Sequence, residues 1–153
     1  MPGYDEKEYL KILHDNWGYA DFRGIQRDII RSIAEGNDTL GLMPTGGGKS
    51  LTFQVPALAK EGVCIVITPL IALMKDQVMA LRRRGIIAAA IYSGMTRRET
   101  VTTLDNCIMG NTKILYVSPE RIASEFFKVK LCRINVSFIT VDEAHCISQW
   151  GYD

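Results

Sequence analysis

The chain has 153 residues, of which 47% are hydrophobic and 23% are charged, and its formal net charge is +1. This length and hydrophobic content predict one domain with a single sizeable core. No apolar run reaches the ~18 residues of a membrane span and no secretion signal is visible, so we expect a soluble intracellular protein, cytoplasmic or nuclear. Because the charge is nearly balanced, no overall basic field indicates nucleic acid, and any DNA contact must come from local groups.

The first predicted elements are two helices. One begins near Asp5 and ends at Trp17 and Gly18, and the second runs from about Ile25 to a stop at Gly36. Five apolar runs of strand length follow, at Thr39–Met43, Val63–Ile67, Ala88–Tyr92, Ile114–Val117 and Val136–Val141.

Helical patterns separate the later strands. Apolar residues keep helical spacing from Leu70 to Leu81, and Thr96-Arg-Arg-Glu99 is a capping-box signature ahead of another helix. Alternation of this kind predicts an α/β domain with a mainly parallel sheet and helices on both faces. No repeat or linker indicates an internal domain boundary.

A glycine-rich segment, Met43-Pro-Thr-Gly-Gly-Gly-Lys-Ser50, lies between the first predicted strand and a helix-compatible stretch. This is the context of a phosphate-binding loop, in which glycines let backbone N–H groups approach an anion. Lys49 is predicted to reach the β- and γ-phosphates, and Ser50 to ligate Mg²⁺. The alternative for this segment alone is an ordinary glycine-rich turn. The expected nucleotide contacts are Thr45, Gly46, Gly47, Gly48, Lys49 and Ser50.

Two adjacent carboxylates, Asp142 and Glu143, come directly after the last predicted strand. Open α/β sheets place ligand sites at the carboxyl ends of their strands. Asp142 suits a Mg²⁺ shell, and Glu143 suits orienting and deprotonating an attacking water. An isolated acidic pair is more simply a solvated turn. Combined with the glycine-rich segment, however, the pair indicates hydrolysis of a nucleoside triphosphate.

The motifs resemble those of a known family. Asp142-Glu-Ala-His145 is similar to the DExH box of superfamily-two helicases, which also tolerate residues other than glycine at Met43. The continuation Cys146-Ile-Ser-Gln-Trp-Gly151 resembles the aromatic-rich loop of RecQ-type DNA helicases. Further RecQ-like segments are Thr68-Pro-Leu-Ile-Ala-Leu-Met-Lys-Asp-Gln77, Tyr116-Val-Ser-Pro-Glu-Arg121 and an adenine motif formed by Tyr19, Phe22, Arg23 and Gln26.

This resemblance implies a RecA-like P-loop domain that uses ATP and Mg²⁺. It implies an ATP-dependent DNA helicase that moves 3′ to 5′ on single-stranded DNA and unwinds tailed duplexes, with roles in DNA repair and recombination. The base of ATP is expected against Tyr19, Arg23 and Gln26. DNA contacts are expected through backbone N–H groups at strand ends and through the aromatic-rich loop, at Thr68, Pro69, Ser118, Gln149 and Trp150.

The chain departs from the family at two positions. Gly24-Ile25 stands where the adenine motif commonly has Pro-Gly, and Tyr152 stands where many relatives have histidine. The sequence also stops at Asp153, before motif III and the second RecA-like domain, which supplies an arginine finger. We therefore expect residues 1–153 to be the N-terminal portion of the first domain, incomplete at its C-terminus and nearly inactive alone.

Two other functions stay open at this point. One is a P-loop enzyme that transfers phosphate to a small molecule, and the other is a non-catalytic module that binds a nucleotide or DNA. Several features also have ordinary structural explanations. Arg82–Arg84 is predicted to be a solvated helix end, Phe126–Lys130 to be amphipathic packing, and Trp150 packs in the core in the alternative to base stacking.

The four cysteines, at positions 64, 107, 132 and 146, have no metal-ligand spacing. Cys64 lies in an apolar strand run, and Cys107 lies on the apolar face of a helix. We expect buried free thiols rather than a zinc site.

Overall fold

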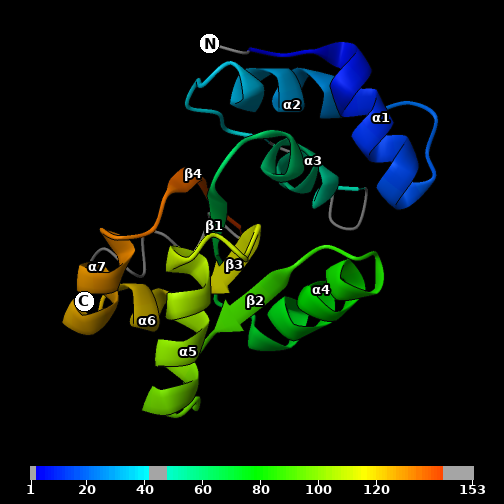
Figure 1. Cartoon of the computed structure of the whole chain (residues 1–153). Coiled ribbons are helices and arrows are strands. Elements are labelled where there is room, and N and C mark those ends of the chain that lie inside the picture. The colour runs from blue at the N-terminus through cyan, green and yellow to red at the C-terminus, as the bar shows by residue number, and fades with distance from the viewer. Residues whose placement is uncertain (1–2, 42–47, 143–153) are drawn as a thin grey trace. The chain divides into compact units, whose positions relative to one another are not determined.

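The computed structural model describes residues 3–41 and 48–142, and these residues form seven helices and four strands (Figure 1). By its internal contacts the chain divides into two compact units, Met1–Glu61 and Gly62–Asp153. The division falls just before the second predicted strand run, although the sequence indicated no boundary there. Each unit has its own buried core.

Three helices make up the described part of the first unit: α1 (Glu6–Trp17), α2 (Gln26–Ala34) and α3 (Leu51–Ala59). The Asp5 carboxylate caps α1 by accepting the Lys7 N–H at 3.1 Å, and Gly18 ends it in the left-handed region at φ 77°. Both helices predicted here are confirmed. Their core consists of Tyr9, Leu13, Phe22, Ile30, Ala34, Leu51 and Val55.

The strand predicted at Thr39–Met43 is wrong for Thr39–Gly41, which have no regular secondary structure. Residues 42 and 43 lie outside the described ranges. A strand requires a neighbouring strand to satisfy its backbone, and the described residues of this unit contain none. Instead, the Thr39 hydroxyl lies 2.7 Å from the Ser32 hydroxyl, and Leu40 is 76% exposed.

The second unit is a parallel sheet with helices. Its elements are β1 (Val63–Ile67), α4 (Ile71–Arg83), β2 (Ala88–Ile91), α5 (Arg97–Ile108), β3 (Ile114–Val117), α6 (Pro119–Ile122), α7 (Glu125–Leu131) and β4 (Val136–Val141). The strand order is β2-β3-β1-β4, and every pairing is parallel. The four strand runs predicted in this region are therefore confirmed, and so is their parallel arrangement.

Helices cover both faces of this sheet. On one face, Ile65 and Leu115 pack with Leu104 of α5 and Phe127 of α7. On the other face, the Tyr116 hydroxyl donates a hydrogen bond of 2.5 Å to Gln77 of α4. The predicted alternation of strands and helices requires helices on both faces of the sheet, and this is what the structure has.

Local predictions in this unit are also confirmed. The Glu99 N–H donates to the Thr96 hydroxyl at 3.1 Å while the Glu99 carboxylate accepts the Thr96 N–H at 2.8 Å, which completes the capping box of α5. Phe127 is buried within α7. Cys64 and Cys107 are buried free thiols as predicted, whereas Cys132 is a free thiol but exposed, so that part of the prediction is wrong. Burial raises the pKa of Cys64 to about 12 and that of Cys107 to about 11. None of the helices among the described residues is both long and apolar enough to cross a membrane.

Candidate functional site

The residues predicted to bind a base lie in the loop between α1 and α2 and at the first residue of α2, and this segment is here called the base loop (residues 18–26). Tyr19 is 47% exposed, and the Arg23 guanidinium carbon lies 5.8 Å from the centre of its ring. Gly24 adopts φ 51°, a left-handed conformation that proline cannot reach. The departure from Pro-Gly thus moves the glycine to the position that turns this loop.

Gln26 connects the base loop to the end of the glycine-rich segment. Its side chain is 3% exposed, and its Oε1 accepts the Arg23 N–H at 2.7 Å. Its Nε2 donates to the carbonyl oxygen of Gly48 at 3.0 Å. A primary amide has two donor hydrogens and an oxygen that accepts twice, so one hydrogen and one lone pair remain for a ligand.

Two features favour glycine at position 48. Its φ of 78° belongs to the left-handed region, and a Cβ built on it would lie 2.4 Å from Gln26 Nε2. The chain then turns at once into α3, because the Leu51 N–H donates to the Gly48 carbonyl at 3.2 Å and the Thr52 N–H donates to the Lys49 carbonyl at 3.1 Å. Lys49 and Ser50 therefore stand at the N-terminus of a helix, where the dipole favours an anion.

Ser50 occupies the cap position of α3, yet its hydroxyl makes no capping hydrogen bond. The Thr52 hydroxyl instead donates to the Lys49 carbonyl at 2.6 Å. Ser50 stands beside Lys49 at the N-terminus of α3, and its predicted role as a magnesium ligand stays a prediction.

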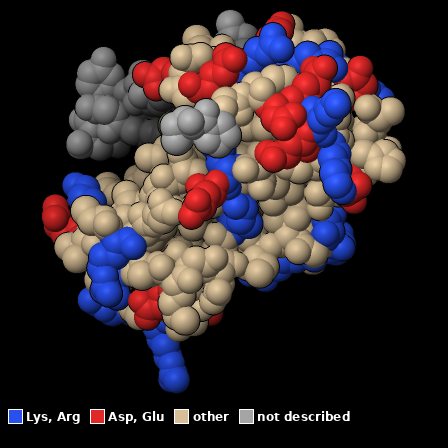
Figure 2. Space-filling view, turned by 45° about the horizontal axis from the view of Figure 1, so that its top comes forward, with Lys and Arg blue, Asp and Glu red and all other residues tan. Residues whose placement is uncertain are grey.

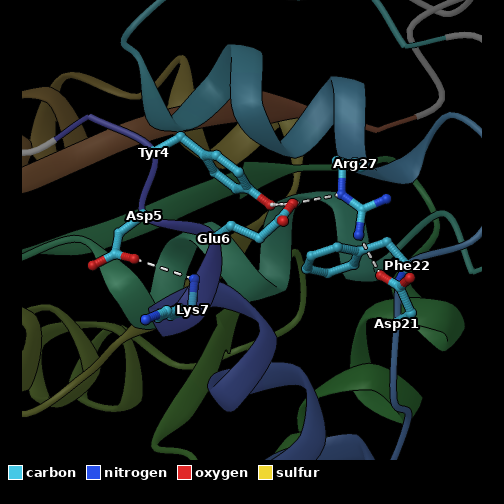
Figure 3. A network of polar contacts seen from close by, with 7 residues as sticks. All are labelled: Tyr4, Asp5, Glu6, Lys7, Asp21, Phe22 and Arg27. Carbon is cyan, nitrogen blue, oxygen red and sulfur yellow. Dashed lines mark hydrogen bonds and ion pairs between the residues drawn. The ribbon is translucent and has the colours of Figure 1, made fainter.

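A polar network around Arg27 connects the base loop to α1 and α2 (Figure 3). Arg27 of α2 donates from Nε to Glu6 of α1 at 2.7 Å and pairs through its other nitrogen with Asp21 of the base loop. Its guanidinium carbon lies 5.8 Å from the ring centre of Phe22, and the Tyr4 hydroxyl donates to the same Glu6 oxygen at 3.3 Å. One cation thus ties together α1, α2 and the loop that carries Tyr19 and Arg23.

In the second unit, backbone hydrogen bonds connect the residues that directly follow β1, β3 and β4, along the edge of the sheet formed by the C-terminal ends of its strands. Each of them donates its backbone N–H to the last residue of the neighbouring strand. The three hydrogen bonds are Ser118 to Ile91 at 3.0 Å, Thr68 to Val117 at 3.1 Å and Asp142 to Ile67 at 2.9 Å. The predicted DNA residues Thr68 and Ser118 therefore lie along the same edge as the predicted magnesium ligand Asp142, which is 7% exposed.

These hydrogen bonds correct one detail of the prediction. The N–H groups of Thr68 and Ser118 are used within the sheet, so these two groups do not face a DNA phosphate. Both side chains are buried as well. The Thr68 hydroxyl accepts the Leu70 N–H at 3.3 Å, whereas the Ser118 hydroxyl has no hydrogen-bond partner among the described residues. Pro69 is half-buried.

The segment after β3 is linked to the segment after β2. The Ser93 hydroxyl donates to the Glu120 carboxylate at 3.1 Å, and Arg121 donates to the Met95 carbonyl at 2.9 Å. Glu120 and Arg121 belong to the motif noted at Tyr116–Arg121, so the motif's charged residues hold a neighbouring loop. On the face drawn in Figure 2, acidic and basic side chains are interspersed, in keeping with the balanced net charge.

Several predicted site residues lie outside the described residues, so their predicted roles stay predictions. They are Thr45, Gly46, Gly47, Glu143, Gln149 and Trp150. The sequence analysis also missed residues that the structure brings to the site. These residues are Arg27, Asp21 and Glu6, and none of them belongs to a motif identified in the sequence. The only signal in the sequence is that residues of opposite charge lie near the base loop.

The chain is similar in sequence to known helicases. The profile of the DEAD/DEAH box helicases matches residues 23–153. The chain is 46% identical over 144 residues to an "ATP-dependent DNA helicase RecQ" of Pasteurella multocida, covering 94% of this chain and 23% of the relative. It is 48% identical over 144 residues to the protein of the same name from Bacillus subtilis, covering 93% and 24%. The resemblance to RecQ-type proteins is confirmed, and the chain spans about a quarter of these relatives' length.

A solved structure supports the fold. The structure of the chain is similar to that of a hypothetical ATP-dependent RNA helicase from Sulfolobus tokodaii, with a TM-score of 0.72 at 19% identity, covering 97% of this chain and 44% of that one. The α/β helicase-domain fold predicted from the sequence is thereby confirmed.

Proposed function

Since the chain belongs to the DEAD/DEAH box helicase family, we propose that it is the ATP-binding part of an ATP-dependent DNA helicase. In this proposal, ATP hydrolysis drives 3′ to 5′ movement along single-stranded DNA and the unwinding of tailed duplexes. Residues 1–153 are proposed to be the N-terminal portion of the first of two RecA-like domains, in line with their coverage of about a quarter of the RecQ relatives.

Recognition of adenine is assigned to the base loop. The exposed Tyr19 ring offers a stacking surface, and Arg23 lies beside it. Gln26 retains one hydrogen and one lone pair after its bonds to Gly48 and Arg23, and adenine presents the complementary acceptor and donor on one edge. Guanine presents the opposite pattern, so this amide favours ATP over GTP.

The phosphates are assigned to the glycine-rich segment. The turn at Gly48 brings Lys49 and Ser50 to the N-terminus of α3, a place that favours anions. Lys49 supplies a positive charge for the β- and γ-phosphates. Thr45, Gly46 and Gly47 complete the loop in this proposal, with backbone N–H groups toward the phosphate oxygens.

The residues present suit a magnesium ion. The Ser50 hydroxyl belongs to the N-terminus of α3, and the Asp142 carboxylate directly follows β4. Both are oxygen donors, which Mg²⁺ prefers. When bound, the ion neutralises charge that develops on the phosphate oxygens. Glu143 is assigned the separate role of orienting the attacking water and accepting its proton.

The DNA strand is assigned to the same sheet edge, with the aromatic-rich loop at Gln149 and Trp150. Thr68 and Ser118, which directly follow β1 and β3 at this edge beside Asp142, support this assignment by their position. Trp150 is assigned to base stacking, which contributes ~1–3 kcal/mol per base in other single-strand binding proteins.

The observation that carries this proposal is the 3.0 Å hydrogen bond between Gln26 and Gly48, because it joins a base-binding loop to a phosphate loop. The test measures ATP binding and DNA-stimulated ATP hydrolysis by the complete protein that contains this chain. Glu143→Gln should keep ATP bound and reduce turnover by ~10²–10⁴-fold, the usual loss of a general base. Lys49→Ala should lose ATP binding, and Asp142→Asn should raise the Mg²⁺ concentration required.

The rival functions give different results in the same assay. A phosphate-transferring enzyme would be stimulated by a small-molecule acceptor and not by oligothymidylate. A non-catalytic module would bind ATP with no hydrolysis that depends on Glu143. Either result would remove the helicase assignment.

A further inference from the structure

Strand β2 ends the sheet within the described part of the second unit. The order β2-β3-β1-β4 leaves one side of β2 without a neighbouring strand. The strand lies between α4 and α5, which pack against it (Figure 1). A bare strand edge presents N–H and C=O groups that another extended segment can pair with.

The outward backbone groups of β2 can be identified. The carbonyl groups of Ile87 and Ile91 face β3, because they accept from Lys113 N at 2.8 Å and from Ser118 N at 3.0 Å. Alternate residues of a strand direct their backbone groups to opposite sides, so those of Ala88 and Ala90 face outward. Arg82 supports this, since its Nε donates to the Ala88 carbonyl at 2.9 Å.

Arg82 therefore closes one end of the edge and leaves the other end open. Arg82 lies in the last turn of α4 and is exposed, as predicted, and its side chain also hydrogen-bonds to β2. Beyond Ala88, the edge continues through Ala90, which lines a cavity. An incoming segment would meet the N–H and C=O of Ala90 before it reached Arg82.

This cavity, the β2 groove, has a volume of about 710 Å³ and runs along the strand edge between α4 and α5. Its apolar lining includes Val78, Met79 and Met95. Met79 is 52% exposed, although methionine usually lies in the core. An exposed apolar strip beside an open strand edge is a feature of peptide-binding grooves.

The charges of the β2 groove are mainly positive. Lys75, Arg82 and Arg98 line it, against a single carboxylate, Glu99. That carboxylate is already bonded to the Thr96 backbone N–H at 2.8 Å as part of the capping box. Lys75 is held in place by the Tyr92 ring, whose centre lies 4.6 Å from its Nζ. The groove thus selects for negative charge on its occupant.

We propose that the β2 groove binds an acidic, extended polypeptide segment of a partner protein, which adds to the sheet as a strand beside β2. The segment's backbone bonds to Ala90, its carboxylates pair with Lys75 and Arg98, and its apolar side chains contact Met79. A peptide fits better than a nucleic acid because Ala90 offers a donor and an acceptor together, and its carbonyl repels phosphate. None of the residues that line the groove is among those assigned to ATP or DNA.

The test uses a short fluorescent peptide that alternates aspartate and valine, titrated against the chain. Lys75→Glu and Arg98→Glu should each weaken binding roughly tenfold, as loss of a complementary charge does. Arg83→Glu makes the same charge change on α4 at a residue that does not line the groove, and it should leave binding unchanged. Melting temperatures of all variants show whether the fold is kept.

Two further probes separate strand addition from charge attraction. A peptide with N-methylated backbone amides keeps its charges but loses its donors, and we expect it to bind much more weakly. The Ala90 N–H should gain protection from hydrogen exchange when the unmodified peptide binds. Equal binding of both peptides, or displacement of the peptide by oligothymidylate with the same dependence on Lys75 and Arg98, would overturn the proposal.

Discussion

The side-chain nitrogen of Gln26 lies 3.0 Å from the carbonyl oxygen of Gly48, so one buried amide links the base loop to the end of the glycine-rich segment. The same amide accepts the Arg23 N–H at 2.7 Å. A ligand that engages Gln26 therefore acts on a group that already holds the backbone next to Lys49. This relationship gives the proposed site a physical link between choice of base and binding of phosphate.

Replacing Gln26 with alanine should weaken ATP binding and abolish the preference for ATP over GTP. The change leaves the Arg23 N–H and the Gly48 carbonyl without their side-chain partner, and an unpaired buried group costs ~1–3 kcal/mol. We expect roughly tenfold weaker binding of ATP, measured by calorimetry with both nucleotides. A variant that still discriminates between ATP and GTP would show that the base is read elsewhere.

Gly48→Ala should harm nucleotide binding more than its backbone conformation alone explains. Alanine is strained at φ 78°, a cost of ~1–3 kcal/mol, and its Cβ would displace the Gln26 amide. Gly110→Ala is the matched control, because Gly110 has φ 85° and open space around the added Cβ. Both variants should melt at lower temperature, and only Gly48→Ala should also lose ATP affinity. Similar affinities for the two would remove the steric argument.

Arg27→Ala should raise the KM for ATP with little effect on kcat. The residue touches no predicted ligand, but it ties Asp21 of the base loop to Glu6 of α1 (Figure 3). We expect an increase of roughly two- to fivefold, because exposed ion pairs have modest effects. Arg27→Lys should restore part of the affinity, and the effect should shrink at high salt. An unchanged KM would mean that the base loop holds its shape without this network.

Glu99 should make the stability of the second unit fall at acidic pH. Hydrogen bonds from the Thr96 backbone and side chain hold the pKa of Glu99 below its ordinary value. A lowered pKa in the folded state stabilises the fold above the unfolded pKa, and this contribution is lost as pH falls through the folded value. Glu99→Gln should therefore flatten the acid limb of a plot of melting temperature against pH. An identical acid limb in the variant would contradict the assignment.

Sequence reasoning succeeded where the signal is local. Asp5 and Gly18 define α1 because a cap and a left-handed glycine act within a few residues, and Thr96 with Glu99 defines the start of α5 in the same way. The strands of the second unit were predicted because each is an apolar run buried in a parallel sheet. The resemblance to a helicase family added the predicted role of Gln26, whereas those of Lys49 and Asp142 were predicted from the local motifs.

Other features depend on contacts that no local pattern encodes. Thr39–Gly41 looks like a strand but lacks a partner in its unit, and pairing decides whether a strand forms. Arg27 contacts residues on two other elements, and Arg82 turns back to the edge of β2. The sequence alone indicates only that both arginines are charged surface residues. The folded structure shows their hydrogen-bond partners.

The last prediction concerns residues 1–153 by themselves. We expect this chain to bind ATP weakly, to hydrolyse it very slowly and not to unwind DNA. The chain spans 23% and 24% of two RecQ relatives, and the family resemblance places the arginine finger in a second domain. Such an arginine contributes ~10³–10⁵ in rate, because it neutralises charge on the γ-phosphate in the transition state.

Unwinding has a further requirement, since two domains must close and open around ATP to turn binding into movement along DNA. A strand-displacement assay on a 3′-tailed duplex, run beside an ATPase assay, compares residues 1–153 with the complete protein. The complete protein with Glu143→Gln is the control for activity that does not depend on hydrolysis. Robust ATP-dependent unwinding by residues 1–153 would show that the second domain is not needed, and the two-domain proposal would fall.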